Sequence, residues 1–285
     1  MFKYSYDITN TGLAYALRDR PTLRSLSISS GNPFHQEYRK VFATSHFIDS
    51  LVSLKGLTCL VLAGLKISYD MLYSIAREGL HLTKLVLKCC TRYSYAGIFC
   101  LLSKCRRFKH LDLEYVDFLN DHHVIQLSSF LGDLVSINLS HCDELTQSSL
   151  FTLSKNCPSL REIKMERIGS KSVENFDSLG DFGQHPQLKS FYLGFNSWLS
   201  DENIIMFSSI FPNFQRLNLK GCVRISEVPK LEVLKLAKTK VGDETLYVIS
   251  KNCGGLLELS LENCHDVTEK GVTRESGRWL QFKDI

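Results

Sequence analysis

The chain has 285 residues, 44% of them apolar, so it can bury a large core, which excludes disordered and collagen-like classes. Its 34 Lys and Arg residues nearly balance 30 Asp and Glu, and a net charge of +4 argues against nucleic acid or a membrane surface as the partner. No secretory signal occurs, and no apolar run approaches the roughly 20 residues of a membrane span. We therefore expect a cytoplasmic or nuclear protein whose ten cysteines are free thiols.

One hydrophobic pattern recurs along the whole chain. Ile8, Leu13 and Leu17 match the helical part of a unit whose strand is mostly missing, and the pattern L-x-x-L-x-L follows. It starts at Leu23, Leu57, Leu82, Phe108, Leu134, Leu160, Leu188, Phe214, Leu231 and Leu256. Most spacings between these starts are 25 or 26 residues. This period lies within the range of about 20 to 29 residues that is typical of leucine-rich repeats.

Two other residue types keep step with this pattern. Five of the six prolines precede a start by two residues, where a residue without an amide hydrogen ends a helix. Eight residues after a start, a small thiol or amide can turn inward and bond the backbone of the turn. The residues at this position are Cys90, Cys142, Asn196, Cys222 and Cys264. Each unit is therefore predicted to form a strand, a turn and a helix.

Stacked units of this kind predict an α/β fold, a leucine-rich-repeat solenoid. Because one unit cannot bury its apolar side alone, neighbours stack into a horseshoe like that of ribonuclease inhibitor, with parallel strands on the concave face and helices on the convex face. We predict a single solenoid domain over residues 1–285, with about ten strand-bearing repeats. It is expected to be incomplete at both ends, since the last residues, 282–285, read as the opening of a further strand.

Three units depart from the common length. The first, between Ile28 and Leu57, and the one containing "GSKSVENFDSLGDFGQHP" are longer, which indicates either a functional loop or a plain loop with its helix. The unit over residues 214–230 is short and lacks the helix. Six residues of fully extended chain span about 20 Å, so the strands on either side of the missing helix can still pair. A deletion or gene-model artefact near Glu227 and a native short repeat both fit this unit.

Several units carry the sequence motif of one repeat subtype. The stretches "HCDELTQSSLFTLSKNCPSL", "GCVRIS" and "NCHDVTEKGV" resemble the cysteine-containing leucine-rich repeat of F-box proteins, with wording similar to plant members. In that family the repeats capture a substrate protein, and an N-terminal F-box binds the Skp adaptor of a cullin-type ubiquitin ligase. The resemblance implies a non-enzymatic, protein-binding module that recognises substrates for an SCF-type ligase in ubiquitin-dependent degradation.

The chain departs from that family at its start. An F-box of roughly 40 residues has no room before the first repeat, and its frequent Leu-Pro pair is absent. The substrate protein is therefore expected on the concave face, whereas Skp-type adaptor and cullin become partners only if an F-box is supplied upstream. A stand-alone repeat scaffold, or a small-molecule sensor of the hormone-receptor kind, is the alternative.

Chemical sites have weaker support than a binding surface. A zinc site at Cys89, Cys90, Cys100 and Cys105, with His122 and His123, lacks the C-x-x-C and H-x-x-x-H spacings. A nucleophilic thiol would have to be exposed beside a base, and phosphate-binding glycine loops are absent. We therefore predict no catalytic residue, no metal and no cofactor.

The concave face is predicted from the residues two, four and six after each start. They include Lys84, Lys88, His110, Asp112, Glu114, Glu162, Lys164, Glu166, Tyr192, Arg216, Asn218 and Lys220. This mixture of charges suits a protein ligand better than a polyanion. Aromatic and basic residues gather on one rim, as in binding hot spots. The predicted partner-binding residues are Tyr192, Phe195, Trp198, Arg216, Lys220 and Arg224. Phe195 and Trp198 are expected to be exposed, unless Trp198 folds back over the longer unit beside it.

Overall fold

The repeat starts are confirmed by the strands. The computed structural model describes residues 2–3, 9–18, 20–29, 41–42, 44–169, 183–225, 232–252 and 256–271. A strand begins two residues after each of the ten predicted starts. Within these strands side chains alternate between the two faces of the sheet, as the pleat requires. In one of them Leu111 is buried, whereas His110 is exposed and Asp112 is half-buried.

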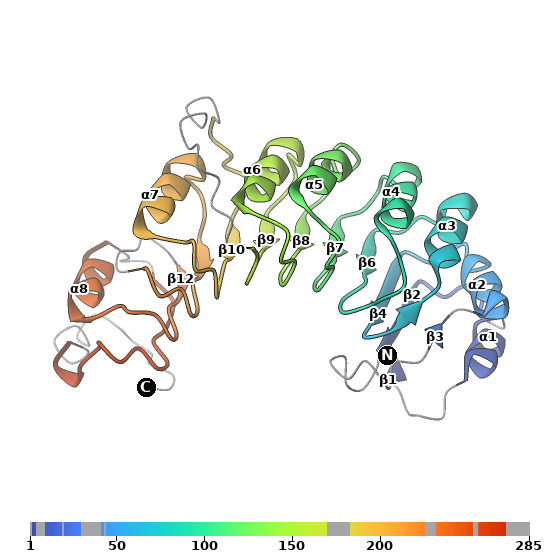
Figure 1. Ribbon diagram of the computed structural model, residues 1–285, viewed down its shortest axis with the longest axis horizontal. Coiled ribbons are helices and arrows are strands. Elements are labelled where there is room, and N and C mark those ends of the chain that lie inside the picture. Colours follow the sequence, from blue (N-terminus) through green and yellow to red (C-terminus); the bar gives the residue numbers. More distant parts are fainter. Residues whose placement is uncertain are drawn as a thin grey trace. The chain divides into compact units, whose positions relative to one another are not determined.

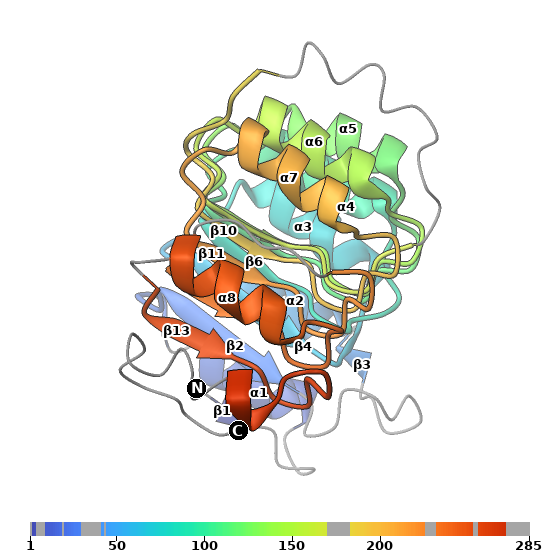
Figure 2. The same cartoon turned by 90° about the vertical axis from the view of Figure 1, so that its left-hand side faces the viewer.

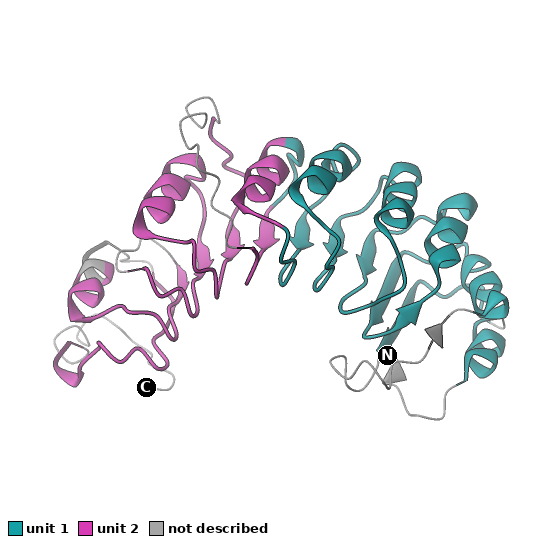
Figure 3. Ribbon diagram, viewed as in Figure 1, with its two compact units in different colours: residues 1–144, 156–160 teal, residues 145–155, 161–285 magenta. Residues whose placement is uncertain are grey.

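The chain divides into two units, which Figure 3 colours separately: residues 1–144 with 156–160, and residues 145–155 with 161–285. In unit 1 the parallel strands of the main sheet follow the order β1-β2-β4-β6-β7-β8, and β3 pairs with β5. The strands of unit 1 are β1 Phe2–Lys3, β2 Ser25–Ser29, β3 Val41–Phe42, β4 Cys59–Ala63, β5 Lys66–Ile67, β6 Lys84–Val86, β7 His110–Asp112 and β8 Ser136–Asn138.

Unit 2 has the same construction. Its parallel strands follow the order β9-β10-β11-β12-β13. They are β9 Glu162–Lys164, β10 Ser190–Tyr192, β11 Arg216–Asn218, β12 Val233–Lys235 and β13 Glu258–Ser260. The short repeat lies between β11 and β12. These two strands pair directly, so the prediction that they can still join is confirmed. The described part of that repeat, residues 214–225, contains no helix.

The helices of each unit lie on one side of its strands (Figures 1 and 2). They are α1 Asn10–Arg18, α2 Ser45–Val52, α3 Tyr69–Glu78, α4 Tyr95–Lys104 and α5 Asp121–Ser128 in unit 1, and α6 Gln147–Asn156, α7 Asp201–Ile210 and α8 Asp243–Asn252 in unit 2, except that Asn156 belongs to unit 1. Their apolar residues recur on one face. In α3, Leu72 and Ile75 are buried while Tyr69 and Tyr73 are exposed.

The cores are built from the leucines of the pattern and from the buried helix faces. In unit 2 phenylalanines replace several leucines: the Phe191 ring on β10 lies 4.9 Å from that of Phe211 and 5.6 Å from that of Phe214, centroid to centroid. Phe207 of α7 stacks on the same ring at 6.1 Å. Aromatic pairs at these separations add to the stabilisation that burial supplies. The core therefore holds β10 and β11 against α7.

The inward-facing residue eight positions after each start links consecutive repeats. The thiols of Cys90, Cys142, Cys222 and Cys264 donate to carbonyls of the preceding repeat, at distances of 3.0 to 3.4 Å. The acceptors are Leu62, Leu113, Leu193 and Leu236. The bond was expected to the backbone of the same turn, whereas these four acceptors lie in the preceding repeat, which a single unit could not show.

One residue earlier, seven positions after the start, the backbone turns through a left-handed conformation in nine repeats. The φ angles lie between 50° and 71°. The residues are Gly64, Cys89, Tyr115, His141, Arg167, Phe195, Gly221, Lys238 and Asn263. The side chains at this position range from the buried Cys89 to the exposed Phe195. Gly64, Gly221, Asn263 and His141 are residue types enriched in this conformation and the other five are not, so the sequence signal for it is weak.

Some predictions fall outside the described residues. They concern most of the long loop in the first unit, residues 170–182 of the 28-residue unit, the join near Glu227 and the final residues 282–285. The single-domain organisation of residues 1–285 also stays a prediction. Among the helices of the described ranges, none combines the length and apolar character that crossing a bilayer requires.

Candidate functional site

The strand side chains that point away from the helices form the open face of unit 2. Because the strands are parallel and in register, residues at the same repeat position line up in rows across the sheet. The row two residues after the starts is Glu162, Ser190, Arg216, Val233 and Glu258. The row four residues after the starts is Lys164, Tyr192, Asn218, Lys235 and Ser260.

Most charges on this face are neutralised locally. Lys164 Nζ lies 3.5 Å from Glu162 Oε1 and 4.6 Å from the centre of the Tyr192 ring, which combines an ion pair with a cation–π contact. Lys235 Nζ lies 2.9 Å from Glu258 Oε1. These side chains are partly exposed, so each ion pair contributes little to folding stability. The two ion pairs nevertheless determine which charges on this face are neutralised.

Two cations on β11 and just beyond it are not compensated in this way. Arg216 is exposed, Lys220 is half-buried, and neither forms an ion pair with any residue in the described ranges. Asn218, between them, donates from Nδ2 to Glu166 Oε1 at 2.9 Å and accepts at Oδ1 from the Lys220 amide at 3.0 Å. The strand therefore presents a positive charge on either side of a fixed amide.

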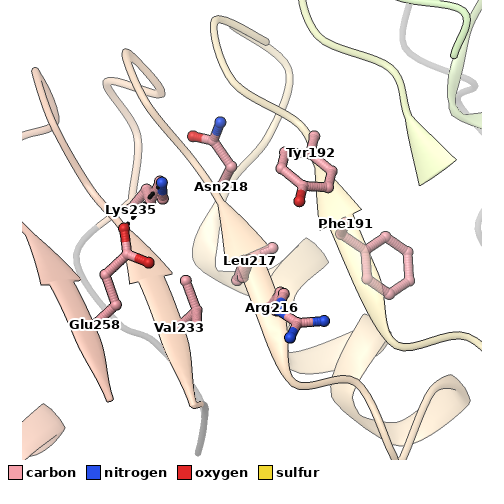
Figure 4. A pocket seen from close by; sticks show the side chains of 8 residues that line it. All are labelled: Phe191, Tyr192, Arg216, Leu217, Asn218, Val233, Lys235 and Glu258. Atoms are coloured by element: carbon pink, nitrogen blue, oxygen red, sulfur yellow. Dashed lines mark ion pairs between the residues drawn. The ribbon is translucent and has the colours of Figure 1, made fainter. Parts of the chain in front are cut away.

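Arg216 borders a small cavity of about 140 Å³ on this face. Figure 4 shows its lining side chains rising from β10, β11, β12 and β13, with the Lys235–Glu258 ion pair on the side away from Tyr192. The lining residues are Phe191, Tyr192, Arg216, Leu217, Asn218, Val233, Lys235 and Glu258. The cavity thus joins an aromatic ring and an aliphatic side chain to a guanidinium group. This combination is enriched at protein-binding hot spots.

Only two of the predicted partner-binding residues line this cavity, and the others lie outside it. Tyr192 and Arg216 line the cavity. Phe195 is 45% exposed, as expected, and its ring packs over Gly221: a Cβ at that glycine would lie 2.5 Å from Phe195 Cδ1. Arg224 is also exposed.

Trp198 differs from its prediction. The residue is only half-buried, but its indole Nε1 is enclosed and has no hydrogen-bond partner. The expectation that Trp198 is fully exposed is therefore wrong, while its role as a contact residue stays a prediction. The repeat register predicts where Trp198 lies in its repeat but not the direction in which its side chain points.

Sequence reasoning missed three outward-facing residues of the cavity: Val233, Lys235 and Glu258. They stand two or four residues after the starts at 231 and 256, so the same rule that selected Arg216 would have found them. Their significance comes from lateral pairing, because β12 and β13 add the far wall of the cavity.

The open face of unit 1 carries a closed polar network. Lys88 Nζ lies 2.8 Å from Glu114 Oε2, and Asn138 Nδ2 donates to both Glu114 Oε2 and Asp112 Oδ2 at 3.1 Å. Burial raises the pKa of the Asp112 carboxyl, although hydrogen bonds from the Glu114 amide and Asn138 oppose this. Burial acts to lower the pKa of Lys88, but its contacts with Glu114 outweigh that effect and raise it.

Most of the described cysteines are core residues, whereas Cys59 and Cys100 are half-buried. Burial raises the pKa of Cys142 and Cys157 to about 12 and that of Cys222 to about 11, so these thiols stay protonated near neutral pH. Within the ranges that the structure describes, no three His, Cys, Asp or Glu side chains are grouped so as to hold a metal ion.

Comparison with known proteins identifies relatives of two kinds. The chain is 25% identical over 229 residues to the DNA repair protein RAD7 of Saccharomyces cerevisiae, covering 73% of this chain and 40% of RAD7. It is 26% identical over 165 residues to the F-box protein SKIP1 of Arabidopsis thaliana, covering 54% of this chain and 50% of SKIP1. The chain thus spans at most half the length of these two relatives. No protein-family model matches it.

Solved structures share the fold. The yeast complex of Rad7 and Elc1 aligns over 95% of this chain and 68% of the matched chain, with a TM-score of 0.60 and 19% identity. Internalin C2 of Listeria monocytogenes aligns over 87% of this chain and 92% of its own, with a TM-score of 0.51 and 17% identity. The predicted α/β leucine-rich-repeat solenoid is confirmed, and so is the resemblance to F-box leucine-rich-repeat proteins.

Proposed function

We propose that this chain is the substrate-recognition part of an F-box-type, SCF-like ubiquitin ligase receptor, acting in ubiquitin-dependent degradation in the cytoplasm or nucleus. It binds a protein through the open face of unit 2 and carries out no catalysis itself. The observation that carries this proposal is the exposed Arg216 beside Tyr192 and the half-exposed face around them, in a chain similar to an F-box protein.

Adaptor binding belongs to the same proposal in a conditional form. A structure of similar fold is a complex of Rad7 with Elc1, and SKIP1 is an F-box protein, which supports a further protein subunit beside a substrate. We propose that Skp-type adaptor and cullin join through an F-box supplied upstream of the repeats. Neither nucleic acid nor a membrane surface is part of this function.

The size of the cavity favours a protein over a small molecule. Sites for small ligands usually enclose about 300 to 1,000 Å³, whereas this cavity measures about 140 Å³. It has room for a side chain of a partner protein but is too small to enclose a hormone-sized compound. The stand-alone scaffold remains as the second reading, since it uses the same surface without the ligase.

The test is affinity purification of the tagged chain from cells treated with a proteasome inhibitor. Arg216→Glu should reduce captured partner at least tenfold with unchanged thermal unfolding, because it reverses an exposed charge at the cavity. Lys155→Glu, on the helix side, is the matched control. The captured partner should also accumulate in cells when the chain is depleted.

Three outcomes would contradict the proposal. Capture that is indifferent to Arg216→Glu would exclude the open face of unit 2. A partner whose abundance does not change on depletion would favour the scaffold. Co-purification of a Skp-type adaptor with the 285-residue chain alone would place adaptor contacts on the repeats and not on an upstream F-box.

A further inference from the structure

The open face of unit 2 has a consistent layout of charge across its strands. Its acidic residues stand on or just beyond the two outer strands, at Glu162 and Glu166 for β9 and at Glu258 and Glu262 for β13. The two cations without an ion-pair partner in the described ranges, Arg216 and Lys220, stand on the middle strand, β11, and just beyond it. Lys164 and Lys235, in the row four residues after the starts, neutralise Glu162 and Glu258 in the row two residues after the starts, and Asn218 binds Glu166.

Arg216 is separated from carboxylates within its own row. Its lateral neighbours are Ser190 on β10 and Val233 on β12, and the acids of that row lie one strand further out on each side. At a strand spacing of about 4.8 Å, that places their backbones about 10 Å from the Arg216 backbone. Arg216 is therefore exposed between an uncharged serine and an uncharged valine.

Lys220 has an equivalent setting at the strand end. The Phe195 amide bonds the Lys220 carbonyl at 2.6 Å, and the Gly221 amide bonds the Ala237 carbonyl at 2.8 Å, so the ladder continues past β11. Its lateral neighbours are then Gly194 and Ala237, which are both small. Glu166 Oε1 lies over Gly194, 3.2 Å from where a Cβ there would stand, and the recess beside this strand is the cavity that Arg216 and Val233 line.

The distance between the two cations defines a ligand. Four residues of extended chain span about 13 Å, and same-face side chains recur every second residue. Two carboxylates four positions apart on an extended segment match Arg216 and Lys220, while the residue midway faces Asn218 and the Tyr192 ring. Guanidinium groups bind carboxylates through two parallel hydrogen bonds, which an ammonium does not offer.

We infer that unit 2 recognises an extended acidic segment of its protein partner, with Arg216 and Lys220 each binding one carboxylate. This inference rests on the protein-binding role proposed above and specifies its ligand. Lys164 and Lys235 do not bind the segment directly, because they hold the flanking acids and keep those acids from competing for Arg216.

The test uses fluorescent ten-residue peptides and the whole chain. The probe contains Gly, Ser and Val with two glutamates four positions apart. One comparison peptide has glutamines at those positions, and another has the two glutamates adjacent. We expect the probe to bind at least tenfold more tightly than the glutamine peptide and at least threefold more tightly than the adjacent-glutamate peptide, and the affinity to fall as salt rises.

Variants assign the binding to the two cations. Arg216→Gln and Lys220→Gln should each weaken probe binding at least fivefold, and the double variant should abolish it. Lys155→Gln removes one exposed cation from α6 and should leave binding unchanged. Circular dichroism and thermal unfolding establish that each variant is folded, since all three positions lie outside the core.

The outcomes separate this inference from the proposed function. Failure of the probe to bind, equal binding of the glutamine peptide, or indifference to Arg216→Gln would overturn the inference. A single-stranded oligonucleotide that binds more tightly than the probe would reassign the cations to phosphate. Probe binding in a chain whose partners are never ubiquitylated would leave the inference standing and refute the ligase role.

Discussion

The open faces of the two units share one repeat register but differ in how their charges are compensated. In unit 1 the acids of the β7 repeat are held inside the protein's own network, by Lys88 at 2.8 Å and Asn138 at 3.1 Å. In unit 2 the corresponding positions of the β11 repeat carry Asn218 and Lys220, and Arg216 stands where the β7 repeat has His110. Neither Arg216 nor Lys220 has an ion-pair partner in the described ranges. Tyr115 and His141 extend the contrast, since their rings stack at 4.1 Å in unit 1.

This difference teaches which positions of a repeat are free to change. The inward leucines and the residue eight positions after the start fix the backbone, because they are buried and bond the preceding repeat. The outward positions contribute little to folding stability. Their charges can therefore be paired within the protein in one unit and left accessible to a partner in the other. A comparison of variants in the two units tests this separation.

The largest effect is expected at an inward position of unit 2. Asn196 accepts from the Ile168 amide at 3.0 Å and donates to the Met165 and Leu193 carbonyls at 2.8 and 2.9 Å. Asn196→Ala leaves Ile168 and Met165 without these bonds in the core, so urea unfolding should show a loss of about 3 kcal/mol.

Cys142 is the matched position in unit 1. Its thiol makes a weaker bond, 3.4 Å to the Leu113 carbonyl, so Cys142→Ala should cost about 1 kcal/mol. Equal losses for Asn196→Ala and Cys142→Ala would mean that volume alone, and not hydrogen bonding to the preceding repeat, defines the inward position.

A smaller effect is expected where the two units turn through positive φ. Gly221→Ala in unit 2 must adopt φ 71° and also displace the Phe195 ring, 2.5 Å from the new Cβ. A loss of about 2 kcal/mol in unfolding free energy is expected. Gly79→Ala in unit 1 has φ 61° with open space around it, so only the backbone strain of about 1 kcal/mol applies.

The double variant Gly221→Ala with Phe195→Ala isolates the ring contact. It should recover most of the difference between the two glycine variants when measured in the same thermal or urea titration. If Gly221→Ala and Gly79→Ala cost the same, Phe195 moves aside freely and does not form a fixed part of the surface.

The smallest effect concerns the network of unit 1 and its pH dependence. Because burial raises the pKa of Asp112, the folded state holds this proton where the unfolded chain has released it, and this contribution to stability decreases as pH rises above about 4. Asp112→Asn removes that dependence. Urea unfolding from pH 4 to 7 should show the stability of the native chain falling relative to that of the Asp112→Asn variant.

A constant difference between Asp112→Asn and the native chain across this pH range would contradict the raised pKa. Lys155→Gln in unit 2 is the control, since it leaves the network of unit 1 unchanged. A larger loss in the variant at pH 7 would show that the charge of Asp112 holds Asn138, and that the network of unit 1 stabilises the fold.

The sequence by itself determined the backbone of this protein. Leucines at fixed offsets have one way to bury their side chains, so the strands begin two residues after every predicted start, and Cys90 and Cys142 occupy the inward position assigned to them. The prediction of outward positions also followed from the alternation of a strand, which selected Tyr192 and Arg216 for the site.

Tertiary structure decided what those positions do together. Whether Lys88 is neutralised depends on Glu114 and Asn138, which come from later repeats, and the same is true of Lys235 and Glu258. Trp198 shows the limit most clearly, because its position in the repeat does not determine the rotamer that encloses its Nε1. The local pattern of apolar residues determines which side chains of a repeat are buried. Charge compensation and side-chain direction depend instead on contacts between residues about 25 positions apart.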